Sequence, residues 1–181
     1  KLLDREAAGE LPEKARKMVQ VALRNGEQLQ LLISDLLDFN KAIAGKMMLQ
    51  IGTIQVSEAL EQAIEGNRSM ATHYGVSLSA VPAPEPLVVR ADPQRLRQIL
   101  DNFISNAIRY TERGGVLVGC RTRGSELCIQ VWDTGRGIAR SDFKRIFQEF
   151  NQLDVERSGQ RRGVGLGLAI VDRIARLLNA R

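Results

Sequence analysis

A long run of apolar residues at helical spacing constrains the architecture of this chain more than any other feature. With one Asn among them, the residues recur every three or four positions: Met18, Ala22, Asn25, Leu29, Leu32, Leu36, Phe39, Ile43 and Met47. This period predicts an amphipathic helix of about 35 residues, interrupted only by Gly26 and Gly45. Helices of this length usually pack against a partner helix, as in coiled coils and bundles.

Two features near this helix bear on how it would pair. Asn25 within the apolar seam is equally consistent with a residue that fixes the register between two chains and with an exposed polar gap. Upstream, Leu2-Leu3 and the stretch Gly9-Glu10-Leu11-Pro12 are typical of the frayed end of an earlier helix and its turn. We therefore expect residues 1–49 to form a helical hairpin that lacks most of its first arm.

Beyond residue 50 the pattern mixes short strands and helices. Strands are expected at 50–56, 76–80 and 87–90, and a hairpin at 116–122 and 126–133 that turns at 123–125. Helices are expected from Ser57 as N-cap to about Thr72, from Asp92-Pro93 to about Tyr110, at 142–154 and at 164–178. This order predicts an α+β fold with helices on one face of a mixed or antiparallel sheet.

Composition limits the class of protein. The chain has 181 residues, 44% hydrophobic and 26% charged, which suits one soluble globular domain with an appendage. No apolar run approaches the roughly 20 residues of a membrane span, so we expect a cytoplasmic region without membrane contact. The net charge of +5 is spread along the chain, which disfavours a nucleic-acid partner. Cys120 and Cys128 could face each other across the predicted hairpin, although reduced thiols are the expected state.

Polar residues on the helix that begins at Asp92 form the first candidate site. Asn102 and Asn106 lie four residues apart, so both amides project from one helix face, and Arg109 follows one turn later. Two amides and a guanidinium suit a metal-bound polyphosphate better than a hydrophobic core. Either Asn alone would more often face solvent or cap a helix, so the combination carries the hypothesis.

Two glycine-rich segments form the second part of the candidate site. The strand that ends at Asp133 is followed by Gly135 and Gly137, which permit close backbone approach to a ligand, and the acid can accept a hydrogen bond from an amine. A simple glycine turn is the alternative. The run Gly163-x-Gly165-x-Gly167 leads into a helix whose free N–H groups favour an anion, or serves packing alone. It is neither a dinucleotide fingerprint nor a P-loop, because Leu168 and the lack of Gly-Lys-Ser/Thr break those patterns.

The segment between these glycines combines an apolar and a polar part. Phe143, Ile146, Phe147 and Phe150 recur at helical spacing and predict an amphipathic helix at 142–154. The following residues, 155–162, are polar and bounded by glycines, which favours a mobile lid.

Four segments resemble, in chain order, the N, G1, F and G2 boxes of sensor histidine kinases. They are Asn102–Asn106, Asp133-x-Gly135-x-Gly137, the Phe-rich stretch and Gly163-x-Gly165-x-Gly167. Ser34–Asp38 and Ala44–Lys46 are also similar to the end of that family's second dimerisation helix. The resemblance covers nearly the whole chain. It implies a Bergerat-type α/β sandwich as ATP-binding catalytic domain in residues 50–181, preceded by a dimerisation unit in residues 1–49, in a homodimer that pairs through the helical hairpin.

The resemblance also implies a role for each matching residue. Asp133 would accept a hydrogen bond from the adenine amine of ATP, with Gly135, Gly137 and Ile138 beside the base and Tyr110 near the base or ribose. Asn106 would ligate Mg²⁺, while Asn102 and Arg109, which is more often Lys in the family, would contact phosphate. The phosphates would be wrapped by the second glycine box: Gly163, Gly165, Leu166, Gly167 and Leu168. In the gyrase-like ATPases of this fold, a Glu occupies the position of Asn102.

The implied activity is transfer of the γ-phosphoryl group of Mg-ATP to a His on the dimerisation helix, and then to a response-regulator Asp. That receiver would be a separate protein or, in a hybrid kinase, part of the same polypeptide. Two departures stand out: the acceptor His is absent, because His73 has none of its neighbours and suits a surface or loop position, and the family's C-terminal strands are not represented. A non-catalytic nucleotide-sensing or dimerisation module of the same fold is the alternative.

Overall fold

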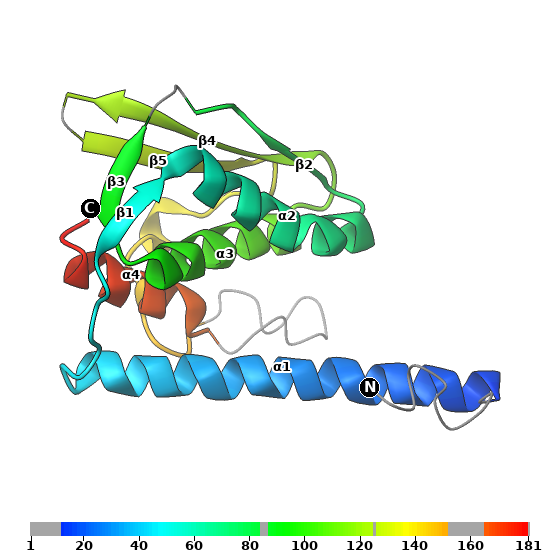
Figure 1. The fold of residues 1–181 in the computed structure, drawn as a ribbon. Coiled ribbons are helices and arrows are strands. Elements are labelled where there is room, and N and C mark those ends of the chain that lie inside the picture. Colours follow the sequence, from blue (N-terminus) through cyan, green and yellow to red (C-terminus); the bar gives the residue numbers. More distant parts are fainter. Residues whose placement is uncertain (1–11, 84–86, 125, 152–164, 181) are drawn as a thin grey trace. The chain divides into compact units, whose positions relative to one another are not determined.

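The structure is a computed structural model that describes residues 12–83, 87–124, 126–151 and 165–180. The chain divides into two compact units, Lys1–Gly45 and Lys46–Arg181 (Figure 1). None of the helices in these described ranges is both long and apolar enough to cross a membrane.

The described part of the first unit contains helix α1, Glu13–Ile43, which confirms the predicted long helix. The helix ends four residues before Met47, because Ala44 caps it and Gly45 takes a left-handed conformation with φ +64°. The expected continuation to Met47 was therefore wrong, and Met47 belongs to the second unit. Several apolar residues of the seam are exposed: Met18, Leu29, Leu36 and Ile43. The predicted first arm of the hairpin lies outside the described residues.

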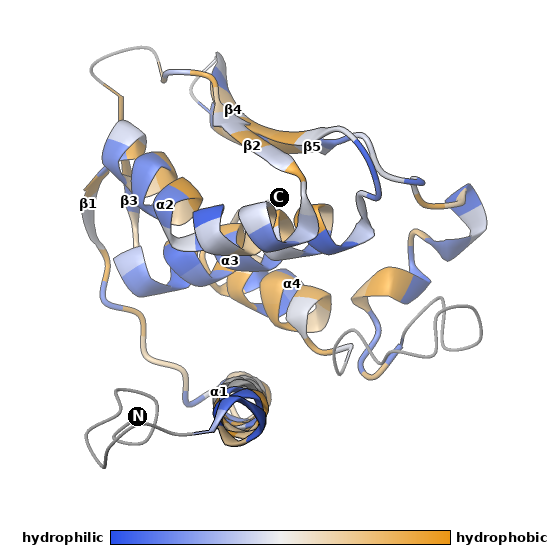
Figure 2. Cartoon of the chain, turned by 90° about the vertical axis from the view of Figure 1, so that its right-hand side faces the viewer, coloured by the Kyte–Doolittle hydropathy of each residue, from blue (hydrophilic) through white to orange (hydrophobic). Residues whose placement is uncertain are grey.

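The second unit has the predicted α+β arrangement. Strand β2 (Ser77–Ala80) pairs in parallel with β4 (Gly115–Arg123), which pairs antiparallel with β5 (Glu126–Asp133). Strands β1 (Gly52–Gln55) and β3 (Val88–Ala91) form a separate antiparallel ribbon. Helices α2 (Val56–Tyr74) and α3 (Pro93–Tyr110) lie along one face of the three-stranded sheet, and α4 (Gly167–Leu177) packs against α3 (Figures 1 and 2).

The core lies between the sheet and these helices. Leu100, Ile104 and Ile108 follow one another at helical spacing and are buried on one face of α3. Val116 and Val118 alternate along β4 and are buried against them. Figure 2 shows the apolar colouring of α3 and of the strands that face it. The residues that recur about every four positions in the helix and every two positions in the strand therefore pack together in one hydrophobic core.

Helix α2 ends near the predicted position but begins differently from the prediction. The expected Ser57 cap was wrong: Gln55 is the N-cap, and no side chain caps this end of the helix. The backbone of Val56 instead donates a hydrogen bond to the Leu87 carbonyl over 3.0 Å, so the neighbouring ribbon fixes where the helix starts. At the other end, Gly75 adopts φ +67° and closes the helix after Tyr74. His73 is exposed in its last turn, on the surface as expected.

The predicted helix at 142–154 was wrong. Over its described part the chain forms two short 3₁₀ turns, Arg140–Asp142 and Arg145–Phe147. The periodic aromatic residues are exposed, by 40% for Phe147 and 61% for Phe150, so no buried face stabilises an α-helix. Phe150 itself has a positive φ of 56°, and its N–H donates to the Gly165 carbonyl, which turns the chain away from a helical path. The predicted lid at 155–162 lies outside the described residues.

The two cysteines lie on opposite faces of the sheet. Cys120 of β4 is opposite Ile129, whereas Cys128 of β5 is opposite Arg121. Because residues that pair across strands share a face and neighbours along a strand alternate, the suggested face-to-face arrangement was wrong. Both thiols are free, and burial raises the pKa of Cys120.

The start of α3 follows the Asp92-Pro93 signature closely. Asp92 Oδ1 accepts hydrogen bonds from the backbone N–H groups of Gln94 and Arg95, and Oδ2 accepts one from Gln50 over 2.7 Å. Burial alone would raise the pKa of this carboxyl group, but the three backbone hydrogen bonds outweigh it and hold the pKa below its ordinary value. Asp92 thus anchors both the helix and the segment before β1.

Replacing Asp92 with Ala should lower the free energy of unfolding by roughly 1–3 kcal/mol at neutral pH, because the cap and the acceptor for Gln50 are lost together. Asp92→Asn keeps a capping oxygen and should cost less. The folded pKa is depressed, so the carboxylate stabilises the fold above its unfolded pKa and loses this effect as the pH falls through the folded pKa. Urea unfolding between pH 7 and pH 3 should therefore show a flatter acid dependence for both variants than for the wild type. An equal acid dependence would contradict this role.

Candidate functional site

The described residues of the predicted site come from three elements: α3, the loop after β5, and the start of α4. The strand register decides where Asp133 lies. Asp133 is opposite Val116, whose side chain is 2% exposed on the helix-facing side of the sheet, so the Asp133 side chain shares that side. Trp132, one residue earlier, points to the opposite face and is 61% exposed. The register therefore places the carboxylate at the end of β5, on the side where α3 packs.

The loop after Asp133 is held in place by its own hydrogen bonds. Asp133 Oδ1 accepts the N–H of Gly135 over 2.8 Å. The Thr134 hydroxyl donates to the Arg113 carbonyl and accepts from the Gly115 N–H, which ties this loop to the one that follows α3. This role of Thr134 has no local signal in the sequence, because its partners lie about 20 residues earlier in the chain.

Gly135 is required by a close approach to α3. A Cβ atom at this position would lie 2.5 Å from the carbonyl oxygen of Tyr110 and 2.7 Å from Asp133 Oδ1. The loop after β5 therefore packs directly on the last residue of α3. Gly137 adopts φ +70°, which favours glycine, and Ile138 is exposed by 46%.

Tyr110 also contacts an arginine that the sequence analysis did not select. The Arg136 Cζ atom lies 5.4 Å from the centroid of the Tyr110 ring, within the range of a cation–π interaction. Tyr110 is 38% exposed. No periodic pattern links these two residues, which explains why the sequence did not reveal the pair.

The start of α4 approaches the middle of α3. The Asn102 Nδ2 atom donates to the Gln98 carbonyl over 2.9 Å, and a Cβ atom on Gly167 would overlap Asn102 Oδ1. Gly167 is the first residue of α4, so the N-terminus of this helix lies against Asn102. The second glycine segment and the paired-amide motif are therefore neighbours in the fold.

Gly165 and the two leucines have separate structural roles. Gly165 has φ +76°, and a Cβ there would lie 2.8 Å from the Asn151 carbonyl oxygen. Leu166 is 3% exposed and belongs to the core, so its side chain contributes packing, whereas Leu168 is half-buried. Gly163, the first glycine of this segment, lies outside the described residues.

Asn106 and Arg109 complete the part of the site on α3. Both are half-buried, and Asn106 lies one turn beyond Asn102 on the same helix. No hydrogen bond to another described residue fixes the Asn106 amide, so its oxygen and nitrogen are available to a ligand. Arg109 does have an interaction partner within the fold.

The donor set suits a nucleotide with a phosphate-bound Mg²⁺ ion. Among the described residues, no group of three His, Cys, Asp or Glu side chains could hold a metal. Mg²⁺ usually keeps several waters and is bound by one or two carboxylates plus substrate phosphates, and in protein kinases an Asn is also a ligand, so a single amide oxygen such as that of Asn106 is compatible with the ion. Gly135 and Gly167, where a Cβ would overlap neighbours, border this region at two points along α3.

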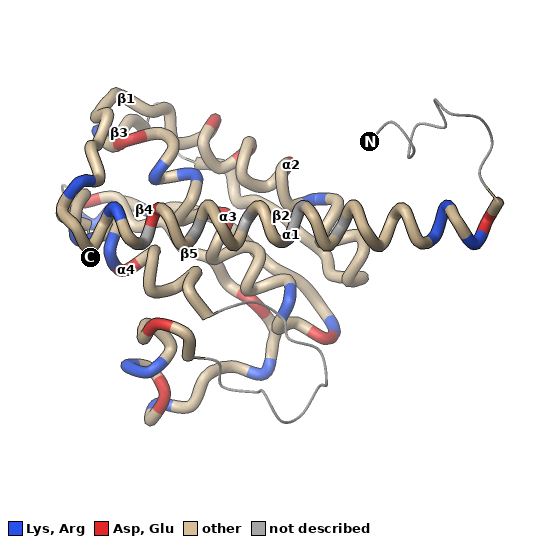
Figure 3. Tube along the Cα trace, turned by 90° about the horizontal axis from the view of Figure 1, so that it is seen from below, with Lys and Arg blue, Asp and Glu red and all other residues tan. Residues whose placement is uncertain are grey.

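Charge over the second unit is mixed. Figure 3 shows Lys and Arg interspersed with Asp and Glu along the described part of the trace. Several of these residues pair with each other within one helix, such as Arg68 with Glu65 and Arg176 with Asp172.

Comparison with known proteins supports the resemblance over most of the chain. Residues 91–181 match the family described as histidine kinase-, DNA gyrase B-, and HSP90-like ATPase. The circadian input-output histidine kinase CikA of Synechococcus elongatus is 37% identical over 96% of this chain and 23% of its own length. Hybrid signal transduction histidine kinase A of Dictyostelium discoideum is 34% identical over 91% of this chain and 8% of its own length. The chain thus spans less than a quarter of either relative.

A solved structure gives the same fold. Full-length ShkA in complex with AMPPNP has a TM-score of 0.79 and 33% identity over 95% of this chain and 36% of its own. The α+β unit with a mixed sheet is therefore the Bergerat fold of histidine kinase catalytic domains.

Proposed function

We propose, from the premise that this chain belongs to the family of histidine kinase-, DNA gyrase B- and HSP90-like ATPases, that it is the ATP-binding catalytic region of a sensor histidine kinase. One observation carries the proposal. Helix α3 contacts the Asp133–Gly135 loop at Tyr110 and the start of α4 at Asn102. These two contact points are about 12 Å apart along the helix axis, a span suited to a nucleotide with its base at one end and its phosphates at the other.

The base end of the site would be formed by Asp133 and its loop. One carboxylate oxygen already accepts the N–H of Gly135, which orients the side chain, and the carboxylate has further acceptor capacity for the adenine amine. Tyr110 would lie beside the base or ribose, with its ring supported by Arg136. Gly135 and Gly137 would let the backbone approach the base.

The phosphate end would be formed by α3 and the start of α4. Asn106 would ligate Mg²⁺, and Asn102 and Arg109 would contact phosphate oxygens. The backbone N–H groups around Gly167 would face anionic oxygens, which the helix dipole of α4 favours. Bound Mg²⁺ would neutralise the charge that develops on the transferred phosphoryl group. Positioning and charge neutralisation, rather than covalent chemistry by this chain, would provide the rate enhancement.

The phosphoryl acceptor would be a His on the dimerisation helix of the parent protein, and the next acceptor an Asp of a receiver domain. The exposed apolar seam of α1 supports pairing of two chains through this helix. The word hybrid in the name of one relative supports a receiver within the same polypeptide. A phosphotransfer assay with the parent protein would distinguish a kinase from a module that only binds nucleotide.

Replacing Asp133 with Asn tests the base end. The amide oxygen can still accept from Gly135, so the loop should keep its shape, while the charged acceptor for the adenine amine is lost. We expect ATP affinity to fall by roughly 1–3 kcal/mol and discrimination against GTP to weaken. Isothermal titration calorimetry with both nucleotides measures this.

Glu126→Gln is the matched control, because it removes the same charge from the other end of β5, about 23 Å away, and should leave ATP affinity unchanged. Unchanged ATP affinity in the Asp133→Asn variant would remove Asp133 from the site.

A further inference from the structure

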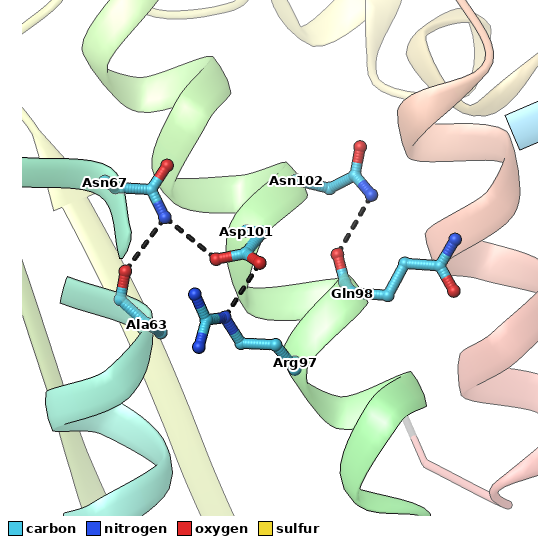
Figure 4. Close-up of polar contacts among 6 residues, drawn as sticks. All are labelled: Ala63, Asn67, Arg97, Gln98, Asp101 and Asn102. Atoms are coloured by element: carbon cyan, nitrogen blue, oxygen red, sulfur yellow. Dashed lines mark hydrogen bonds and ion pairs between the residues drawn. The ribbon is translucent and has the colours of Figure 1, made fainter. Parts of the chain in front are cut away.

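A side-chain hydrogen bond from the buried Asn67 to the half-buried Asp101 joins α2 to α3 beside the candidate site (Figure 4). The Asn67 Nδ2 atom donates to Asp101 Oδ1 and to the Ala63 carbonyl, both over 2.8 Å. Asn67 is only 7% exposed, and within the described core it is one of few polar residues. On the outer side, the Arg97 Nε atom donates to Asp101 Oδ2.

This hydrogen bond lies in an interface between α2 and α3 that is otherwise largely apolar. The Arg97 guanidinium of α3 also lies against Gly66 of α2. The rest of the contact includes apolar residues of the core cluster: Leu60, Ala63, Ile64, Ala71, Leu100, Ile104, Ala107 and Ile108. Apolar packing decides which face of α3 is buried, but it tolerates small rotations of the helix because hydrophobic attraction has no preferred direction. A hydrogen bond is directional and costs free energy when a buried partner is left unsatisfied. The hydrogen bond between Asn67 and Asp101 therefore adds a directional contact to the apolar packing of α3 on α2.

The same rotation controls the residues of the candidate site. Asp101 and Asn102 are consecutive, so their side chains are about 100° apart around α3. Figure 4 shows Asp101 toward α2, whereas Asn102 lies on the side of α4, where its Oδ1 meets Gly167. Asn106 lies one turn farther along the same helix. A rotation of α3 would move both amides with respect to the start of α4.

We propose that Asn67 is a positioning residue for the nucleotide site, which acts through Asp101 to hold the Asn102 and Asn106 amides toward the phosphate end. This inference rests on the proposed ATP-binding function and adds a residue that has no contact with the nucleotide. The Arg97–Asp101 ion pair should contribute less, because Arg97 is 36% exposed whereas Asn67 is buried, and exposed ion pairs contribute little.

Three variants of this chain separate positioning from stability. Asn67→Leu removes the hydrogen bond but fills a similar volume in an apolar interface, so the fold should survive. Asp101→Asn keeps an oxygen that can accept from Asn67 and is the conservative control. Arg97→Ala removes the ion pair with Asp101 and the contact of the guanidinium with Gly66, but leaves the Asn67 hydrogen bond in place, and is the second control.

The first readout is nucleotide affinity of variants shown to be folded by circular dichroism and urea unfolding. We expect Asn67→Leu to weaken Mg-ATP binding by about 2- to 30-fold, in the range for residues that act on a site without touching its ligand. Affinity for adenosine should change little, because adenosine has no phosphates to contact the Asn102 and Asn106 amides. A general loosening of the fold would instead weaken the binding of both ligands. Both controls should bind Mg-ATP like the wild type. Equal loss for Mg-ATP and adenosine, or no loss for Mg-ATP, would overturn the inference.

The second readout needs no nucleotide. The side-chain amide resonances of Asn102 and Asn106 should shift in the Asn67→Leu variant and remain in place in Asp101→Asn. If the wild type failed to bind Mg-ATP, the proposed function would fail, while these resonances would still test how α3 is held. If the wild type bound Mg-ATP and the resonances were unchanged in Asn67→Leu, only the positioning role would be overturned.

Discussion

Replacing Asn106 with Ala is expected to abolish Mg²⁺-dependent ATP binding while the fold persists. The variant removes the side chain assigned to the metal, and loss of a metal ligand should weaken Mg-ATP binding by at least about 100-fold, the upper effect of removing even a supporting group. The fold should survive because Asn106 is half-buried, makes no hydrogen bond to another described residue and lies within a helix that Ala favours.

Calorimetry with ATP in the presence of Mg²⁺ or of a chelator measures the metal-dependent part of this affinity. Gln94→Ala is the matched control, because it truncates an exposed amide in the first turn of the same helix. Asn106→Asp keeps the shape of the side chain and adds a charge, so it tests whether the position tolerates a carboxylate. An Asn106→Ala variant that binds Mg-ATP as well as the wild type would show that Asn106 is not a ligand of Mg²⁺.

Elements whose boundaries depend on local chemistry were predictable from the sequence. Helix α3 begins at Pro93 and ends at Tyr110, as expected, because Asp92 caps it through its own side chain and Pro93 suits the first turn. The hairpin of β4 and β5 was also predicted correctly, since the alternation of apolar residues and the glycine near the turn are local signals.

Elements that depend on distant contacts were not predictable. The aromatic spacing at Phe143, Phe147 and Phe150 indicated a helix, but a helical period specifies a helix only where one face is buried, and these residues are exposed. The start of α2 is set by the hydrogen bond from Val56 to Leu87, which no local pattern around Ser57 reveals. Cys120 and Cys128 illustrate the same limit, because a register decides which face each residue takes.

In the candidate site too, features with a local sequence pattern were predictable and contacts between distant residues were not. The paired amides Asn102 and Asn106 were recognisable because their spacing places them on one face of any helix. In contrast, the contact of Arg136 with Tyr110 and that of Asn67 with Asp101 join residues with no periodic relation. The glycines were recognisable as a pattern, but only the fold gives the reason for two of them: a Cβ at Gly135 would meet Tyr110, and one at Gly167 would meet Asn102.

The identity of residue 102 leads to the second prediction, that this chain binds ATP but hydrolyses it very slowly. In the gyrase-like ATPases that this chain resembles, a Glu at the matching position acts as general base toward water. An amide cannot accept a proton at neutral pH, and the nitrogen of Asn102 already donates to the Gln98 carbonyl. General-base assistance typically contributes about 10²–10⁴-fold in rate, so water should be a poor nucleophile here. An imidazole carries its own lone pair and needs little such help, so an added helical hairpin that bears the acceptor His should become phosphorylated.

Asn102→Glu and Asn102→Gln together test this explanation, because both lengthen the side chain beside Gly167 and only Glu supplies a base. We expect phosphate release to be slow in the wild type and in Asn102→Gln, and faster in Asn102→Glu than in Asn102→Gln. Steady-state phosphate release by the isolated chain, without any His acceptor, is the decisive measurement. Sustained turnover at about 1 per second, the lower end of kinase rates, would show that the amide at position 102 does not determine the choice of nucleophile.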